Sequence, residues 1–313
     1  MLSFSFTDVN GEKFNAENPL YIVINRDENI PADDLTVVFP IMDLSRELCE
    51  VSAYEEDKIV FKGIVDEQIN VTDEKDNYTK IIARSMAAVL LDNESRPISY
   101  SYPSTRVIVK EHLEPCGIKE YEGVEKTLDG NLKIPKGMSN WQAATAFSLK
   151  AFNRTPRVEE DGTVNFNGVE SDLKLRFSNT DGIKYNSFKE NNKRCKVLSR
   201  IYARTGSKGN YNTVLKNKKA EKRGVNRRRY IDTLADSSLL IGDAMIRNSE
   251  KSSYEITATS PECLLNALGA EAVFDDRKTL YNDLYVSGIY YRSTPEREET
   301  MLTIKKEFQN VDT

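Results

Sequence analysis

Short β-strands separated by turns follow one another through the first ninety residues, and this pattern constrains the fold more than any other feature. Residues 2–6, 20–24 and 35–39 alternate apolar with polar side chains or gather β-branched and aromatic ones. Further strands are predicted at 50–54, 59–66 and 78–84. Such a density of short strands is typical of a β-barrel or a β-sandwich.

Helical signals separate this region from a second β-rich region. Ser139 is a predicted N-cap for a helix over 140–152. The stripe expected to be buried on this helix consists of Trp141, Ala144, Thr145, Leu149 and Phe152. Other helices are predicted at 104–113 and 234–249, and residues 156–166 are predicted to form a hairpin with an Asp-Gly tip.

The order of elements predicts a mainly β fold with α insertions (α+β), in which a small insert joins two β-barrel-like domains. A chain of 313 residues can form two or three cores of useful size. We expect the first β domain, with a helical extension, over 1–117 and an α+β insert over 118–180. The second β domain is expected over 181–313, with a basic loop at 216–229.

Charge and hydropathy predict a folded protein with no general affinity for nucleic acid and no membrane-spanning segment. Hydrophobic residues make up 39% of the chain and charged residues 30%. The net charge of −5 gives no global attraction to phosphate backbones. The N-terminus lacks the pattern of a secretion signal, and no apolar run could span a bilayer. We therefore expect synthesis and folding in the cytoplasm.

Catalytic and metal-binding patterns are absent from the sequence. His112 is the single histidine, and it is expected at the surface or edge of its helix, without a serine or cysteine partner. The four cysteines lack paired zinc spacing, and no glycine-rich phosphate loop has the required form. We predict no catalytic residues, cofactor or metal. The 49 Asp and Glu residues leave a carboxylate-dependent cell-wall hydrolase as an alternative.

A basic segment is the strongest candidate for partner contact. Its cations are Lys216, Lys218, Lys219, Lys222, Arg223, Arg227, Arg228 and Arg229, offset nearby by Glu221. They could meet an acidic protein surface or nucleic acid, although a solvated loop is the favoured interpretation. No aromatic residue interrupts the segment before Tyr230, which weakens a role in binding single strands. Phe308, Gln309 and Asn310 near the C-terminus are further candidate contacts.

Several motifs, in this order, resemble those of phage tail hub proteins. These proteins include the late-control protein D group and the baseplate hubs of defective Gram-positive prophages and R-type bacteriocins. The first motif is a strand that carries Gly63 and Val65. A later strand ends in Arg84 and Ser85, and a short helix then leads to Pro97. Residues 139–142, 161–166, 253–258 and 303–306 continue the resemblance over nearly the whole chain.

The resemblance implies a structural baseplate hub. Such a hub is a homotrimeric ring that adapts a sixfold tail tube to a threefold spike in a contractile injection particle. The implied partners are the tail tube or tube-initiator protein, the central spike and other baseplate proteins, with DNA at most passing transiently through the lumen. No catalytic residues carry over. The sequence leaves open another β-rich, tube-like tail component, and whether the particle is a phage or a bacteriocin.

Overall fold

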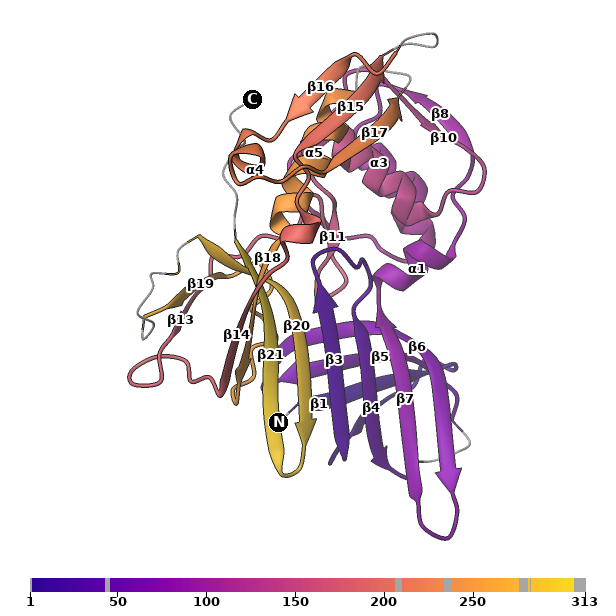
Figure 1. The fold of residues 1–313 in the computed structure, drawn as a ribbon. Helices are drawn as coiled ribbons and strands as arrows, with labels where there is room; N and C mark the ends of the chain where they lie inside the picture. The colour runs from indigo at the N-terminus through magenta and orange to yellow at the C-terminus, as the bar shows by residue number, and fades with distance from the viewer. Residues whose placement is uncertain are drawn as a thin grey trace. The chain divides into compact units, whose positions relative to one another are not determined.

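The computed structural model describes residues 2–42, 46–205, 210–233, 238–275, 281 and 283–306. Strands predominate and helices are few (Figure 1), so the predicted mainly β class with α insertions is confirmed. The chain divides into two compact units. The first unit comprises Met1–Asp172, Pro261–Gly269 and Gly288–Thr300, and the second comprises Leu173–Ser260, Ala270–Ser287 and Met301–Thr313. The three-part division expected from the sequence stays a prediction.

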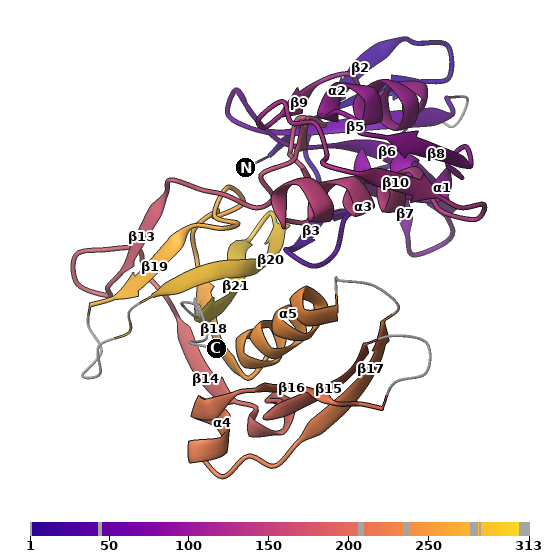
Figure 2. The same ribbon diagram turned by 90° about the horizontal axis from the view of Figure 1, so that it is seen from above.

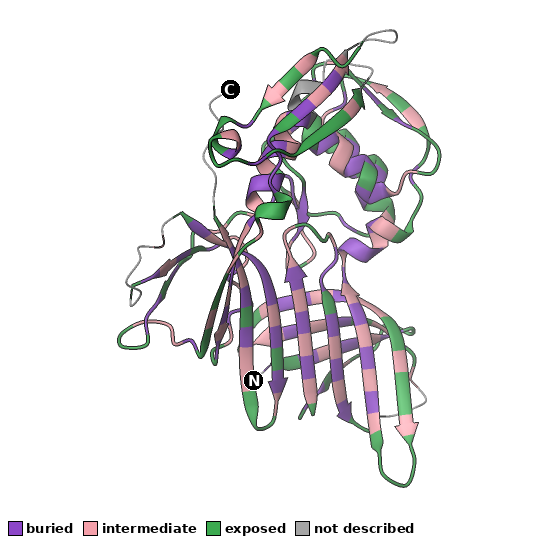
Figure 3. Cartoon of the chain, viewed as in Figure 1, coloured by how far each residue is buried: buried purple, intermediate pink, exposed green. Residues whose placement is uncertain are grey.

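An antiparallel sheet forms the base of the first unit. Its strand order is β20-β3-β4-β7-β6-β5-β1-β2. The strands are β1 (Ser3–Asp8), β2 (Lys13–Ala16), β3 (Tyr21–Asp27), β4 (Asp34–Pro40), β5 (Leu48–Glu55), β6 (Lys58–Thr72) and β7 (Asn77–Ser85), with the first-unit part of β20 (Leu284–Thr294). Buried and more exposed residues alternate along them (Figure 3), as the period of two in the sequence predicts.

This sheet curls around an aromatic core. Phe4 in β1 lies edge-on to Phe39 in β4, with ring centroids 5.5 Å apart. Phe6 contacts the same ring at 5.8 Å. Three strands lie between β1 and β4 in the sheet order, so these contacts require the sheet to bend back on itself. The predicted barrel-like form of the first β region agrees with this curl.

Short helices and strands complete the first unit. They are α1 (Ala87–Asp92), β8 (Ile98–Ser101), α2 (Thr105–Ile108), η1 (Val109–Leu113), η2 (Glu114–Cys116), β9 (Tyr121–Glu122), β10 (Asn131–Ile134), α3 (Asn140–Phe152), β11 (Arg157–Val158) and β12 (Val164–Asn165). The predicted hairpin is confirmed, because Val158 pairs with Val164 across β11 and β12. No helix in the described ranges is long and apolar enough to cross a membrane.

Helix α3 begins where the sequence predicts but buries a different stripe. Ser139 and Gln142 form a capping box, in which each side chain bonds the other residue's backbone N–H. Trp141 is buried in the core, as expected, whereas Leu149 is 48% exposed. The predicted burial of Leu149 is wrong, because the buried face runs through Ala144, Phe147 and Ala151.

A second curled set of strands belongs to the second unit. Its strand order is β13-β19-β20-β21-β18-β14. The strands are β13 (Lys174–Phe177), β14 (Ser187–Asn192), β18 (Tyr254–Ser260), β19 (Glu271–Phe274) and the second-unit parts of β20 and β21 (Arg297–Lys306). Phe188 in β14 contacts Phe274 in β19 at 4.9 Å, again across three intervening strands. Both β regions therefore close around an aromatic contact of the same kind.

Candidate partner-binding surface

The basic segment 216–229 forms regular structure in the second unit. The segment contributes to β16 (Thr213–Lys216), α4 (Lys218–Lys222) and β17 (Arg228–Thr233). The elements η3 (Arg194–Lys196) and β15 (Arg200–Thr205) precede it in the chain. The Asn217 side chain accepts the Ala220 N–H at 3.0 Å and caps α4. Ala220 also packs against Val197 and Val225 in a small buried cluster. The segment is therefore not the loop expected from its charge, because apolar residues between the cations anchor it.

Helix α5 (Ser238–Lys251) covers one face of the sheet β16-β15-β17 (Figure 2). Ile201 of β15 packs against Ile246 of α5, with Leu215 and Ile231 from the outer strands beside them. Gly242 allows this close packing, since a Cβ there would lie 2.1 Å from the Leu215 Cδ1 atom. Because strand side chains alternate, the neighbouring residues project from the other face.

The uncovered face carries a tyrosine cluster. Tyr202 of β15 stacks on Tyr230 of β17, with centroids 5.1 Å apart and planes 19° from parallel. Tyr211 lies edge-on to Tyr230 at 5.1 Å, and its hydroxyl donates to the Asp232 carboxylate at 2.7 Å. The Tyr230 side chain remains 55% exposed. We call this uncovered face the tyrosine face. It carries Tyr202, Tyr211 and Tyr230, with Lys216 and Arg228 in register beside them.

A row of cations borders these rings. Strand register places Lys216 of β16 and Arg228 of β17 on either side of Arg200. Arg200 bonds the Glu221 carboxylate of α4 at 2.5 Å, so its charge is offset. Lys216 and Arg228 are exposed and have no ion-pair partner among the described residues. The tyrosine face thus combines an aromatic centre with uncompensated positive charge.

The other cations of the segment 216–229 do not share the register of Lys216 and Arg228. Arg229 pairs in register with Ile201 and therefore projects from the other side of β17. Arg223 lies 3.8 Å from the buried Glu250 carboxylate. Lys218, Lys219, Lys222, Arg227 and Arg229 are exposed and form no ion pair with any described residue. The candidate contacts at 308–310 lie outside the described residues.

His112 is buried, and the expectation of a surface position is wrong. The helical run from α2 into η1 turns it inward, and its side chain is 1% exposed. Its Nδ1 atom lies 2.8 Å from the Ser95 hydroxyl, and its Nε2 atom lies 3.0 Å from the Tyr100 hydroxyl. Burial lowers the pKa of His112. Ser95 is also 1% exposed, so this serine–histidine pair is a polar contact within the core.

A buried ionic cluster in the first unit is a feature that the sequence analysis missed. Asp33 contacts the guanidiniums of both Arg26 and Arg157. Arg26 also reaches the Glu160 carboxylate at 2.5 Å and the Val60 carbonyl at 2.9 Å. The available signal was the alternation in β3, where Arg26 occupies an inward position after Ile22 and Ile24. Among the residues that the structure covers, no group of His, Cys, Asp and Glu side chains could hold a metal ion.

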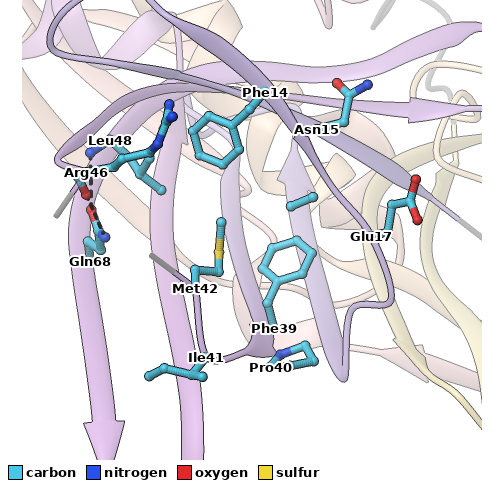
Figure 4. A pocket seen from close by; sticks show the side chains of 11 residues that line it. Phe14, Asn15, Glu17, Phe39, Pro40, Ile41, Met42, Arg46, Leu48 and Gln68 are labelled. Atoms are coloured by element: carbon cyan, nitrogen blue, oxygen red, sulfur yellow. Dashed lines mark hydrogen bonds between the residues drawn. The ribbon is translucent and has the colours of Figure 1, made fainter. Parts of the chain in front are cut away.

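A pocket of about 370 Å³ opens beside the aromatic core of the first unit (Figure 4). Its lining is mostly apolar and includes Phe14, Phe39 and Met42. Gln68, one of its polar residues, bonds the Leu48 N–H at 3.1 Å and the Arg46 carbonyl at 3.0 Å. The Arg46 guanidinium stacks over Phe14 at 5.1 Å. Gln68 and Arg46 therefore make contacts within the protein that stabilise the wall of the pocket.

The fold is that of phage tail proteins. A tail protein from Neisseria meningitidis MC58 superposes with a TM-score of 0.77 at 17% identity, covering 98% of this chain and 97% of that one. The 43 kDa tail protein of prophage MuSo2 from Shewanella oneidensis gives 0.73 at 12% identity, covering 97% and 98%. The E. coli c3393 protein, a type VI secretion component similar to the T4 tail proteins gp27 and gp5, gives 0.57 at 8% identity, covering 93% and 74%. No family model and no curated protein matches the sequence.

Proposed function

We propose that this chain is the structural hub subunit of a contractile-tail baseplate. In this proposal three copies form a ring that joins a sixfold tube to a threefold spike, together with other baseplate proteins. The E. coli protein with a similar fold is described as similar to the T4 tail proteins gp27 and gp5, which supports a place in a tail or a tail-like secretion particle. The particle is assembled from subunits made in the cytoplasm.

The observation that carries the proposal is the presence of two curled sets of strands in one chain. Each closes through an aromatic contact across three intervening strands, Phe4 with Phe39 and Phe188 with Phe274. Two such sets of strands in each of three copies supply six similar units, the number that a sixfold tube requires. Cyclic closure through one repeated contact leaves no free end.

The test is the mass of the purified protein by light scattering, followed by negative-stain imaging of the same peak. We expect a trimer with a central hole, and co-assembly with the tube and spike proteins of the same particle. Long tubes would instead indicate a tube component. A monomer that degraded purified peptidoglycan would indicate a cell-wall hydrolase, and either result would overturn the hub proposal.

A further inference from the structure

The tyrosine face has the composition of a protein interface. Its centre is aromatic, and Val214 of β16, at 37% exposed, pairs in register with Tyr202. Lys216 and Arg228 form the rim next to these residues. Tyrosine and arginine are enriched in protein–protein interfaces. They are also among the residues that contribute most to the binding free energy.

The rings are less suited to stacking with nucleic-acid bases. Tyr202 covers one side of the Tyr230 ring, and Tyr211 lies edge-on against it. These contacts already use part of the Tyr230 ring surface on which a base would stack. The geometry therefore favours an acidic protein surface as the occupant.

The same chain offers a surface of the opposite charge. Its net charge is −5 and the segment 216–229 carries +7, so the remaining residues carry −12. Part of this negative charge lies on the far part of the β6–β7 hairpin. Glu67, Asp73, Glu74 and Asp76 are exposed there and form no ion pair with described residues. Lys75 is the cation among them at the tip.

This hairpin is shaped for docking. The pairing of β5 with β6 ends at Ile64, so the later residues of β6 pair with β7 alone. Figure 1 shows the hairpin extending beyond the neighbouring strand β4. Asp73 accepts the N–H groups of Lys75 and Asp76, each at 2.7 Å, which fixes the turn. Ile69, at 37% exposed, adds an apolar contact behind the acidic tip.

We propose that the tyrosine face of one copy binds the acidic β6–β7 hairpin of the next copy. The aromatic centre would pack on Ile69 of the hairpin, while Lys216 and Arg228 would pair with Glu74 and Asp76. The contact joins two different surfaces, which is what a closed cyclic ring requires. The inference rests on the proposed ring and names the contact that closes it.

A charge swap tests this contact. One variant carries Lys216→Glu with Arg228→Glu, a second carries Glu74→Lys with Asp76→Lys, and a third combines all four changes and keeps the wild-type net charge. The second variant leaves the turn-forming Asp73 intact. The matched control is Lys133→Glu with Lys136→Glu, two exposed lysines of the first unit without ion-pair partners in the described chain.

Light scattering over a protein dilution series gives the trimer dissociation constant. We expect each two-residue reversal on its own to weaken assembly by roughly 100-fold or more, and the combined variant to recover most of it. The control should assemble like the wild type, and high salt should weaken wild-type assembly. Circular dichroism establishes whether each variant folds. If the Lys216→Glu, Arg228→Glu variant does not fold, Lys216→Gln with Arg228→Gln replaces it, and Glu74→Gln with Asp76→Asn replaces the hairpin variant in the same way.

Trimers that persist unchanged in both reversals would overturn this contact and leave the hub proposal standing. A wild-type protein that is monomeric at every concentration would overturn the contact and the self-closing ring together. Retained trimers combined with binding of a labelled single-stranded oligonucleotide, lost in the Lys216→Glu, Arg228→Glu variant, would assign the face to nucleic acid instead.

Discussion

The Arg157 guanidinium donates to the carboxylate of Asp33, and both side chains are almost fully buried. The two residues lie 124 positions apart, and their contact fastens the β11–β12 hairpin to the turn between β3 and β4. Arg157 also donates to the Ile30 carbonyl of that turn at 3.1 Å. The hairpin and the curled sheet of the first unit are thereby joined through a charged contact.

Removing Arg157 should destabilise the protein strongly. Arg157→Met leaves the buried Asp33 with one guanidinium in place of two, and breaking such a pair typically costs about 3–5 kcal/mol in free energy of unfolding. Urea denaturation measures the loss. The control is Arg154→Met, which removes an ion pair with Glu170 in which both side chains are about half exposed, and should cost under about 1 kcal/mol. Equal losses for the two variants would contradict a special role for Arg157.

Glu159 should make stability depend on pH. Burial, reinforced by the neighbouring Glu160 charge, raises the pKa of Glu159 to about 6 from an ordinary 4.5. The folded state therefore binds the proton more tightly than the unfolded state, and its free energy of unfolding falls as pH rises from 4.5 to 6. Glu159→Gln keeps an acceptor for Asn165 and should remove this loss, worth at most about 2 kcal/mol at pH 7. Denaturation at pH 4.5 and pH 7.5 compares the two proteins, and identical pH profiles would refute the effect.

His112 should make the free energy of unfolding fall on acidification, which is opposite to the effect of Glu159. Burial lowers its pKa below the unfolded value of 6.5, so its proton binds the unfolded state more tightly and stability falls as pH drops through that value. His112→Gln loses the contact to Ser95 or Tyr100 and should destabilise by about 1–3 kcal/mol at pH 7.5. The gap between wild type and variant should narrow by pH 5.5. A gap that widened on acidification would show that the buried histidine is charged.

Gly63 should tolerate no side chain. A Cβ at this position would lie 2.1 Å from the Arg84 carbonyl oxygen and 2.9 Å from the Phe61 ring. Gly63→Ala must push β6 away from β7, and overpacking of this kind typically costs about 1–3 kcal/mol. The midpoint of thermal unfolding reports the loss. Lys62→Ala, at a partly exposed neighbouring position, is the control and should shift that midpoint much less.

Local patterns in the sequence determined the elements. The period of two placed the strands of the first β region, Ser139 marked the start of α3, and an Asp-Gly pair marked the β11–β12 hairpin. These features depend on side chains within a few positions of one another, because caps, turns and strand alternation are short-range effects. The mainly β class follows from them.

Tertiary structure decided which side chains meet. Tyr202 and Tyr230 stack because β15 and β17 pair in parallel and place these two residues side by side. The sequence of either strand alone does not predict this register. Burial of His112 and the pairing of Asp33 with Arg157 likewise depend on partners far along the chain. The basic segment is ordered because residues such as Ala220 and Val225 find a distant apolar neighbour in Val197. Burial and register are set by contacts between segments, so the sequence determined where the strands lie, and the packing of those strands determined which surface can bind a partner.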